Sequence, residues 1–197
     1  MRSRPVAANR CLLLMVISLL AWPMTSFCSD VADILRRVAI TPPAKVAFRE
    51  ERHNSMLREP LVLSGYLEYL APGQMKKVIE SPFQEAFMVS DKAVEIERDG
   101  EIHKLPLSRS RSLRTLLGGI EAIISGNETE LRETFDLELL ESPDGWSIRF
   151  TPRSKRVARN LENLHVTGSG DVIDSICISL GANEWQKIEL NQGNNGL

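Results

Sequence analysis

Cysteine is scarce in this 197-residue sequence, which holds three, and histidine is equally rare. Cys11 and Cys28 both fall within the N-terminal segment, so the rest of the chain has Cys177 alone and cannot form an internal disulfide. None of the histidines lies two to four residues from another histidine or from a cysteine: His53, His103 and His165. This spacing is unlike that of a local zinc site. We therefore expect no metal and no cofactor.

Basic residues are in the minority once the N-terminal segment is set aside. Arg2, Arg4 and Arg10 belong to that segment, which leaves 21 basic against 26 acidic residues in the rest of the chain. The sequence contains no long basic tract, which is the usual electrostatic signature of a nucleic-acid-binding chain. We expect no nucleic-acid partner.

The N-terminal segment has the layout of a secretory signal peptide. Its arginines precede an apolar run over residues 11–22, which Pro23 and a short polar stretch follow. The run of about twelve residues is shorter than the roughly twenty that a membrane-spanning helix needs. We interpret residues 1–28 as a cleaved export signal rather than a retained membrane anchor, and we expect residues 29–197 to form a single periplasmic domain.

Four residues at the predicted cleavage site distinguish a released protein from a lipid-anchored one. Ser26 and Cys28 are small residues at the −3 and −1 positions of a cut before Ser29. In a lipoprotein Cys28 would be acylated, and a small residue would stand directly before it, where this chain has Phe27. The sequence favours a soluble protein, which we expect to be a monomer.

From residue 45 onward the apolar residues alternate as they do in strands. Every second position of residues 61–69 is leucine or tyrosine except Gly65, which places these apolar residues on one face of a strand. Asp99-Gly100 marks the clearest hairpin turn. After residue 135 the alternation returns, and Trp146, Ile148 and Phe150 share a face. These runs predict about eleven short antiparallel strands.

Helical periodicity interrupts the strands in three places. Residues 30–39 predict a short leading helix. Apolar residues at helical spacing over residues 113–124 predict a longer helix, with Ser112 as its N-cap and Gly126 as its end. Residues 127–135 predict a third, shorter helix. The expected fold class is mainly β with a few α-helices, in which a helical insertion follows the sixth strand.

No residue pattern argues for catalysis. Gly168-Ser-Gly170 resembles part of a nucleophile elbow, but a predicted strand follows it where that motif needs a helix. Cys177 stands between Ile176 and Ile178 in a predicted strand, where a small buried side chain is the better interpretation. We expect a binding protein rather than an enzyme.

The predicted first strand is unusually rich in charge, with the sequence FREER at residues 48–52. One interpretation is a solvated strand face, on which charges also discourage edge-to-edge aggregation. The other is a set of charges that lines the mouth of a binding cavity. The sequence leaves both open.

Several of these features occur in a fixed order: a strand with Phe48, the segment PLVLSGYLEY at residues 60–69, Pro72-Gly73, Ser81-Pro82 and Val89-Ser90-Asp91. This order resembles the periplasmic outer-membrane lipoprotein carrier family, LolA, and more closely the LolA-related proteins. The resemblance extends over nearly the whole chain after residue 28.

The resemblance implies an unclosed antiparallel β-barrel that helices cover, with an apolar cavity for acyl chains between them. It implies lipid, fatty-acyl or lipoprotein cargo, an inner-membrane donor, an outer-membrane acceptor and no covalent chemistry. Alternation and the helical stripe supply the candidate cavity residues: Phe48, Leu67, Tyr69, Phe87, Val89, Leu113, Leu116, Leu117, Ile120, Trp146, Ile148 and Phe150.

One position departs from the family pattern. Carriers of the family proper have an arginine directly before the proline of the turn that follows the Ser-Gly strand, where this sequence has Ala71 before Pro72. The difference favours a LolA-related specialist over delivery to the standard acceptor. A regulatory periplasmic sensor with the same half-barrel is the second hypothesis, and a hydrolase is the third.

Overall fold

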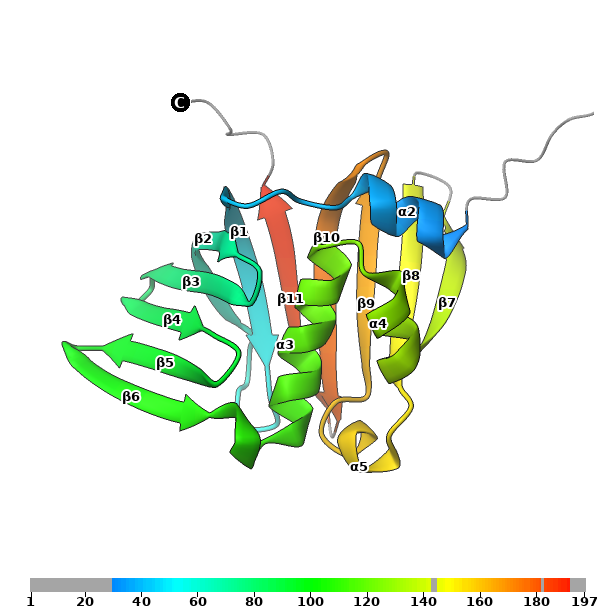
Figure 1. Ribbon diagram of the computed structural model, residues 1–197. Coiled ribbons are helices and arrows are strands. Elements are labelled where there is room, and N and C mark those ends of the chain that lie inside the picture. Colours follow the sequence, from blue (N-terminus) through cyan, green and yellow to red (C-terminus); the bar gives the residue numbers. More distant parts are fainter. Residues whose placement is uncertain (1–29, 143–144, 182, 192–197) are drawn as a thin grey trace, which may run out of the picture.

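The computed structural model describes residues 30–142, 145–181 and 183–191, which form one sheet of eleven antiparallel strands and a layer of helices (Figure 1). The predicted signal segment, Asp144 of a predicted hairpin and residues 192–197 lie outside the described residues. The strands are β1 (Ala44–His53), β2 (Leu61–Ala71), β3 (Gln74–Ser81), β4 (Glu85–Val89), β5 (Ala93–Arg98), β6 (Glu101–Pro106), β7 (Phe135–Ser142), β8 (Gly145–Pro152), β9 (Asn163–Ser169), β10 (Val172–Gly181) and β11 (Glu184–Asn191).

The sheet order is β6-β5-β4-β3-β2-β1-β11-β10-β9-β8-β7. Consecutive strands are therefore sheet neighbours except β6 and β7, and β1 beside β11 is the one long-range pairing within the described sheet. Strands β6 and β7 are the two edges, and they do not pair with each other, so the barrel is unclosed as predicted. At the predicted β5–β6 turn, Asp99 and Gly100 both adopt positive φ, of 54° and 80°, which suits a tight hairpin.

Five helical elements accompany the sheet: α2 (Val31–Arg37), the 3-10 turn η2 (Leu107–Arg109), α3 (Arg111–Ile124), α4 (Glu128–Thr134) and α5 (Lys155–Ala158). The three predicted helices correspond to α2, α3 and α4. Figure 1 shows α2, α3 and α4 lying across the concave side of the curved sheet. No predicted element corresponds to the two shortest ones, η2 and α5.

The ends of α3 follow from its sequence, with one correction. The predicted N-cap Ser112 is wrong, because Ser110 caps the helix and its Oγ accepts a hydrogen bond from the Leu113 N–H at 3.2 Å. Both serines have the right chemistry, and the first apolar residue of the stripe does not by itself mark where the helix begins. At the other end Gly126 has a φ of +70°, as the stop signal predicted.

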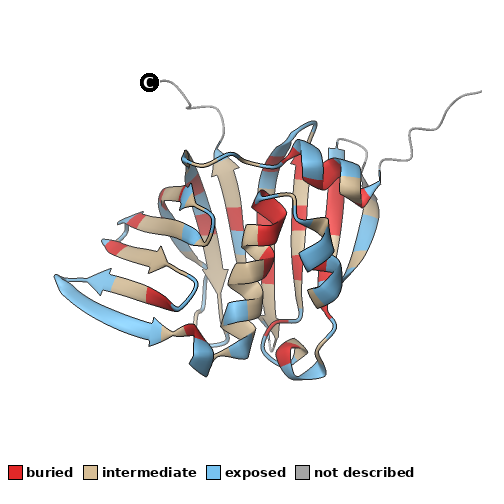
Figure 2. Cartoon of the chain, in the orientation of Figure 1, coloured by how far each residue is buried: buried red, intermediate tan, exposed pale blue. Residues whose placement is uncertain are grey.

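The buried side chains are not spread evenly over the sheet. Figure 2 shows them concentrated on α3 and on the strands from β8 to β10, whereas β6 is exposed along its length. This asymmetry divides the concave face into two regions.

Candidate functional site

The strand register shows which side chains share the concave face. Residues directly opposite each other on neighbouring strands point to the same side of a sheet. Phe48 on β1 pairs with Gly65 on β2, which pairs with Ile79 on β3, and all three are buried. The same rule assigns Leu67 and Phe87 to this face, since both pair with Lys77.

One region of the concave face, which we call the packed half, consists of β7 to β11 with α4. Many of its apolar side chains are almost completely enclosed, although Leu139 on the edge strand β7 is 38% exposed; the enclosed ones include Leu131, Phe135, Ile148, Phe150, Leu164 and Val166. The rings of Phe135 and Phe150 meet edge to face, with centroids 6.2 Å apart. This region is a close-packed core of the ordinary kind.

The helix α3 approaches the packed half through a glycine. A Cβ atom at Gly119 would come within 2.9 Å of the Phe135 ring and 3.4 Å of a Leu164 methyl carbon. Such contacts leave no room for a side chain, so Gly119 lets the helix lie close to the core. Ala122 and Ile123, on the same side of the helix, are buried.

The other region, which we call the open half, consists of the concave face of β2 to β6. Several of its apolar side chains are half-buried, as at Leu67, Phe87 and Val89, and Leu105 on the edge strand is 47% exposed, whereas Leu63 and Ile79 are buried. The facing side chains of α3 are half-buried too: Leu113, Leu117 and Ile120. With about 3.6 residues per turn, these three lie around the helix from Gly119, towards the open half.

The twelve predicted cavity residues all lie on the concave face or on α3, but they fall in different regions. Trp146, Ile148 and Phe150 belong to the packed half, and Leu116 packs, as Leu67 and Phe87 do, against the one buried cluster that spans both halves. The others adjoin or line the open half: Phe48, Leu67, Tyr69, Phe87, Val89, Leu113, Leu117 and Ile120. Whether any of the twelve contacts an acyl chain stays a prediction.

A network of charged side chains crosses the concave face beside the open half. Glu50 is fully buried, and its Oε1 accepts hydrogen bonds from Arg52 Nε at 3.1 Å and from the Arg52 guanidinium at 3.0 Å. Its other oxygen accepts a hydrogen bond from Lys77. Burial lowers the pKa of the Lys77 ammonium, and the neighbouring Glu50 carboxylate opposes that shift. A buried carboxylate needs such partners to remain ionised.

This network bears on the two interpretations of the charge-rich strand. Arg49 and Glu51 point to the convex side and pair with each other at 2.6 Å, so they form a solvated strand face. Glu50 and Arg52 point the other way and lie on the concave face. The first interpretation therefore holds for Arg49 and Glu51, and whether Glu50 and Arg52 line the mouth of a cavity stays a prediction. The sequence missed Lys77, whose spacing from Glu50 gives no local signal.

A second polar contact ties α3 to the open half. The Glu121 carboxylate accepts a hydrogen bond from the Gly73 N–H in the β2–β3 turn. Burial raises the pKa of the neighbouring Tyr69 hydroxyl, and the charge of Glu121 raises it further. This turn directly follows Ala71, the last residue of β2.

The described surface has two pockets away from this face. One, of about 330 Å³, is lined by Glu128, Thr129, Arg132 and Glu133, and the other, of about 220 Å³, by Phe83, Gln84, Arg98 and Asp99. Neither is lined by a predicted cavity residue.

Other chemistry within the described residues is limited. Ser147 Oγ lies 2.5 Å from His165 Nε2 on the convex face, where burial and then Arg149 lower the pKa of that imidazole. Neither residue lines either of these two pockets. Among the described ranges, no three His, Cys, Asp or Glu residues are grouped as metal ligands, and no helix is long and apolar enough to span a bilayer.

Comparison with known proteins gives one family match. A family model described as outer membrane lipoprotein carrier protein LolA-like matches residues 24–192. No curated protein matches the chain. Among solved structures, LolA superfamily protein NE2245 from Nitrosomonas europaea has a TM-score of 0.43 and 10% identity, over 81% of this chain and 90% of that one.

Two other solved structures are similar to the same extent. Lipoprotein LppX from Mycobacterium tuberculosis has a TM-score of 0.43 and 10% identity, over 84% of this chain and 96% of that one. MucB of Pseudomonas aeruginosa, in its complex with MucA, has a TM-score of 0.45 and 12% identity, over 82% of this chain. The alignment spans 55% of the MucB chain.

Proposed function

Because the chain belongs to the LolA-like family of outer membrane lipoprotein carrier proteins, we propose that it is a periplasmic carrier. It binds the acyl chains of a lipid or lipoprotein in the open half and moves them from an inner-membrane donor towards an outer-membrane acceptor. The observation that carries the proposal is the half-buried apolar surface that α3 and β2 to β6 present to each other.

In this mechanism α3 is a lid over the open half. Burial of about ten methylenes contributes roughly 8 kcal/mol before any costs. Association and ordering offset much of that free energy. The apolar stripe of Leu113, Leu117 and Ile120 competes with the acyl chain for the same strands, which lowers the net affinity further. A carrier needs that balance, because cargo that binds too tightly is not released.

The packed half would anchor the lid while it moves. Gly119 lets one side of α3 lie close to Phe135 and Leu164. On another side of the helix, the Glu121 carboxylate accepts a hydrogen bond from the Gly73 N–H. We assign to Glu121 the role of a latch that favours the closed position in the absence of cargo. The Ala71 substitution leaves the handover partner open, and a LolA-related specialist is the favoured form of the proposal.

A charge in the lid stripe tests this proposal. Leu117→Asp or Ile120→Asp should weaken binding of a fluorescent fatty acid at least tenfold, because an unpaired carboxylate would face the acyl chain. The control Ser125→Asp adds the same charge at the exposed end of α3 and should bind nearly as the wild type does. Unchanged binding by a stripe variant that keeps its strand signature in circular dichroism would contradict the lid.

Mass spectrometry of protein purified from periplasm tests the cargo class. The proposal predicts a co-purified lipid or acylated molecule. Variants of the protein that lack the apolar residues of the open half should not retain it. Capture of an anti-sigma factor without lipid would instead favour the sensor hypothesis.

A further inference from the structure

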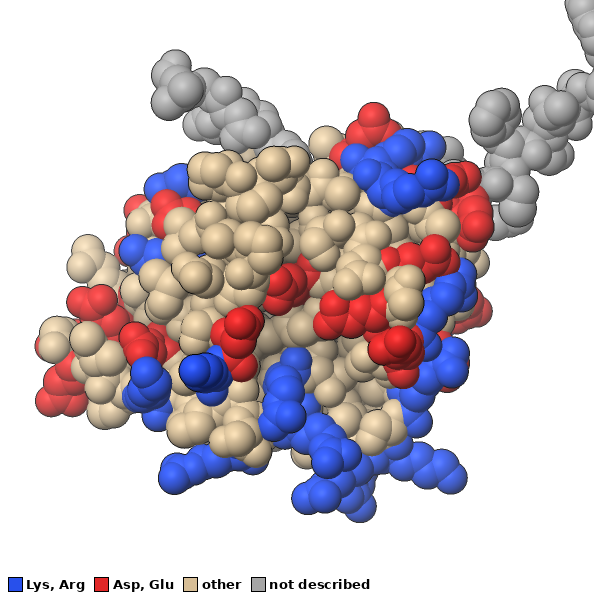
Figure 3. Space-filling model, in the orientation of Figure 1, with Lys and Arg blue, Asp and Glu red and all other residues tan. Residues whose placement is uncertain are grey.

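One end of the molecule gathers cations from three separate elements. We call it the basic end, and its residues are Arg109 of η2, Arg111 and Arg114 of α3, Lys155 and Arg156 of α5, and Arg159. All six are exposed. Helices α3 and α5 lie in contact. Figure 3 shows Lys and Arg side chains gathered along the lower edge of the molecule.

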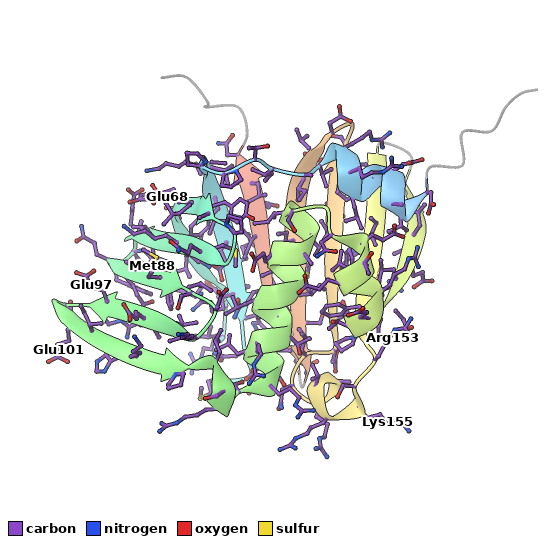
Figure 4. The ribbon with its side chains drawn as sticks, viewed as in Figure 1. Glu68, Met88, Glu97, Glu101, Arg153 and Lys155 are labelled. Atoms are coloured by element: carbon purple, nitrogen blue, oxygen red, sulfur yellow. The ribbon has the colours of Figure 1, made fainter. Side chains whose placement is uncertain are left out.

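The basic end is separated from acidic side chains. Residues 102–120 and 145–161, which supply it, contain no Asp or Glu. Within the described chain five of its cations form no ion pair, and Arg114 bonds only the Leu107 carbonyl oxygen, at 3.1 Å. Figure 4 shows Glu97 and Glu101 on the distant β5–β6 hairpin, well away from Lys155.

Lys and Arg side chains outside the basic end mostly lie beside carboxylates. At the opposite end of the molecule Arg37 Nε lies 3.4 Å from Asp171, and Arg36 pairs with Asp33 in the same helix. Most other Lys and Arg side chains of the described ranges also lie within ion-pair distance of a carboxylate. The chain has an excess of acidic residues to supply such partners, so their absence from this one end is a feature of the fold.

The position of these cations is also unfavourable for the helices that carry them. The N-terminal end of a helix has a partial positive charge and is stabilised by acidic residues. Helix α4 follows that preference with Glu128 and Glu130, whereas α3 has Arg111 and no acid in its first turn. The placement lowers helix stability, so another interaction is needed to explain it.

We propose that the basic end docks the protein on an anionic phospholipid surface. The cations are spread over three elements on long exposed side chains, and neither described pocket is lined by any of them. Such a surface suits many headgroups at once rather than one enclosed anion. Leu105, exposed on β6 two residues before η2, adds an apolar side chain beside the charges.

The docked orientation serves the proposed carrier, because α3 begins at this surface and a lipid would reach the open half from the membrane. The docking itself does not depend on acyl binding, so the two can fail separately.

Vesicle sedimentation tests the docking. The purified protein is mixed with vesicles of phosphatidylcholine alone or of equal parts phosphatidylcholine and phosphatidylglycerol. Wild type should bind the anionic vesicles alone and release as salt increases. The variant Arg111→Gln/Lys155→Gln/Arg156→Gln should lose roughly a hundredfold in affinity, since each cation near such a surface is worth about a fivefold change.

A matched control separates the basic end from net charge. Arg36→Gln/Arg37→Gln/Lys45→Gln removes three cations from paired positions outside the basic end and should bind anionic vesicles within about threefold of wild type. Equal losses in both variants, or no preference of wild type for phosphatidylglycerol, would overturn the proposal. So would wild-type binding to an acidic polypeptide but not to vesicles.

Fatty-acid binding without vesicles keeps the two proposals apart. The basic-end variant should bind the fluorescent fatty acid as wild type does. Loss of that binding would reassign the cations to the cargo site and contradict docking. Vesicle binding by a wild type that takes up no fatty acid would instead contradict the carrier function and leave the docking intact.

Discussion

The packed half and the open half are built from the same sheet, yet many of their apolar side chains differ in burial. In the packed half Phe150 is 0% exposed and meets the Phe135 ring. In the open half Phe87 has the same chemistry on an equivalent strand face and is only half-buried. From this difference we infer that the packed half contributes more to the free energy of folding, whereas the open half keeps apolar surface that a ligand can cover.

The largest expected effect comes from matched phenylalanine truncations. Phe150→Ala should lower the free energy of unfolding by about 3–5 kcal/mol, because it opens a cavity in a close-packed core. Phe87→Ala should cost about 1 kcal/mol, because less of that ring leaves water on folding. Urea denaturation measures both. Equal losses of unfolding free energy in the two variants would contradict the proposed difference between the halves.

A smaller effect is expected at the charged network. Glu50→Gln keeps the shape of the side chain but leaves Arg52 and Lys77 without their carboxylate, so unfolding free energy should fall by about 2–3 kcal/mol. The control Glu51→Gln alters the exposed ion pair on the other face of β1 and should cost less than about 0.5 kcal/mol. A Glu50 variant as stable as the control would show that the network contributes nothing to the fold.

The smallest effect concerns the latch. Glu121→Gln replaces the charged acceptor of the Gly73 N–H with a neutral one, which should weaken that contact by about 1 kcal/mol. Amide hydrogen exchange in the α3 region should then quicken roughly fivefold, with little change in β8 and β9. Exchange that quickens equally in both regions would mean that Glu121 stabilises the whole domain rather than the lid.

Much of the strand layout could be predicted because alternation is a local signal. The eleven strands, the α3 stripe and the shared face of Trp146, Ile148 and Phe150 all follow from spacing along the chain. The division into two halves could not be predicted in this way. Ile148 and Leu67 show the same alternation, yet Ile148 is 1% exposed and Leu67 is half-buried, because enclosure depends on what packs over each strand.

Features that join distant segments were also missed. Lys77 reaches Glu50 from another strand, and Glu121 reaches Gly73 from the lid helix. The basic end combines residues near 110 with residues near 156, so neither segment alone forms a long basic tract. Pairings of this kind depend on the three-dimensional arrangement, which local periodicity does not contain.

Photo-crosslinking with a fatty acid that carries a photoreactive group in its chain tests the central claim most directly. After irradiation and digestion, mass spectrometry locates the modified residues. The account predicts adducts on β2 to β5 and on the lid stripe, with Leu67, Phe87 and Leu117 among them. Adducts confined to the packed half or to the convex face, or no saturable labelling at all, would contradict it.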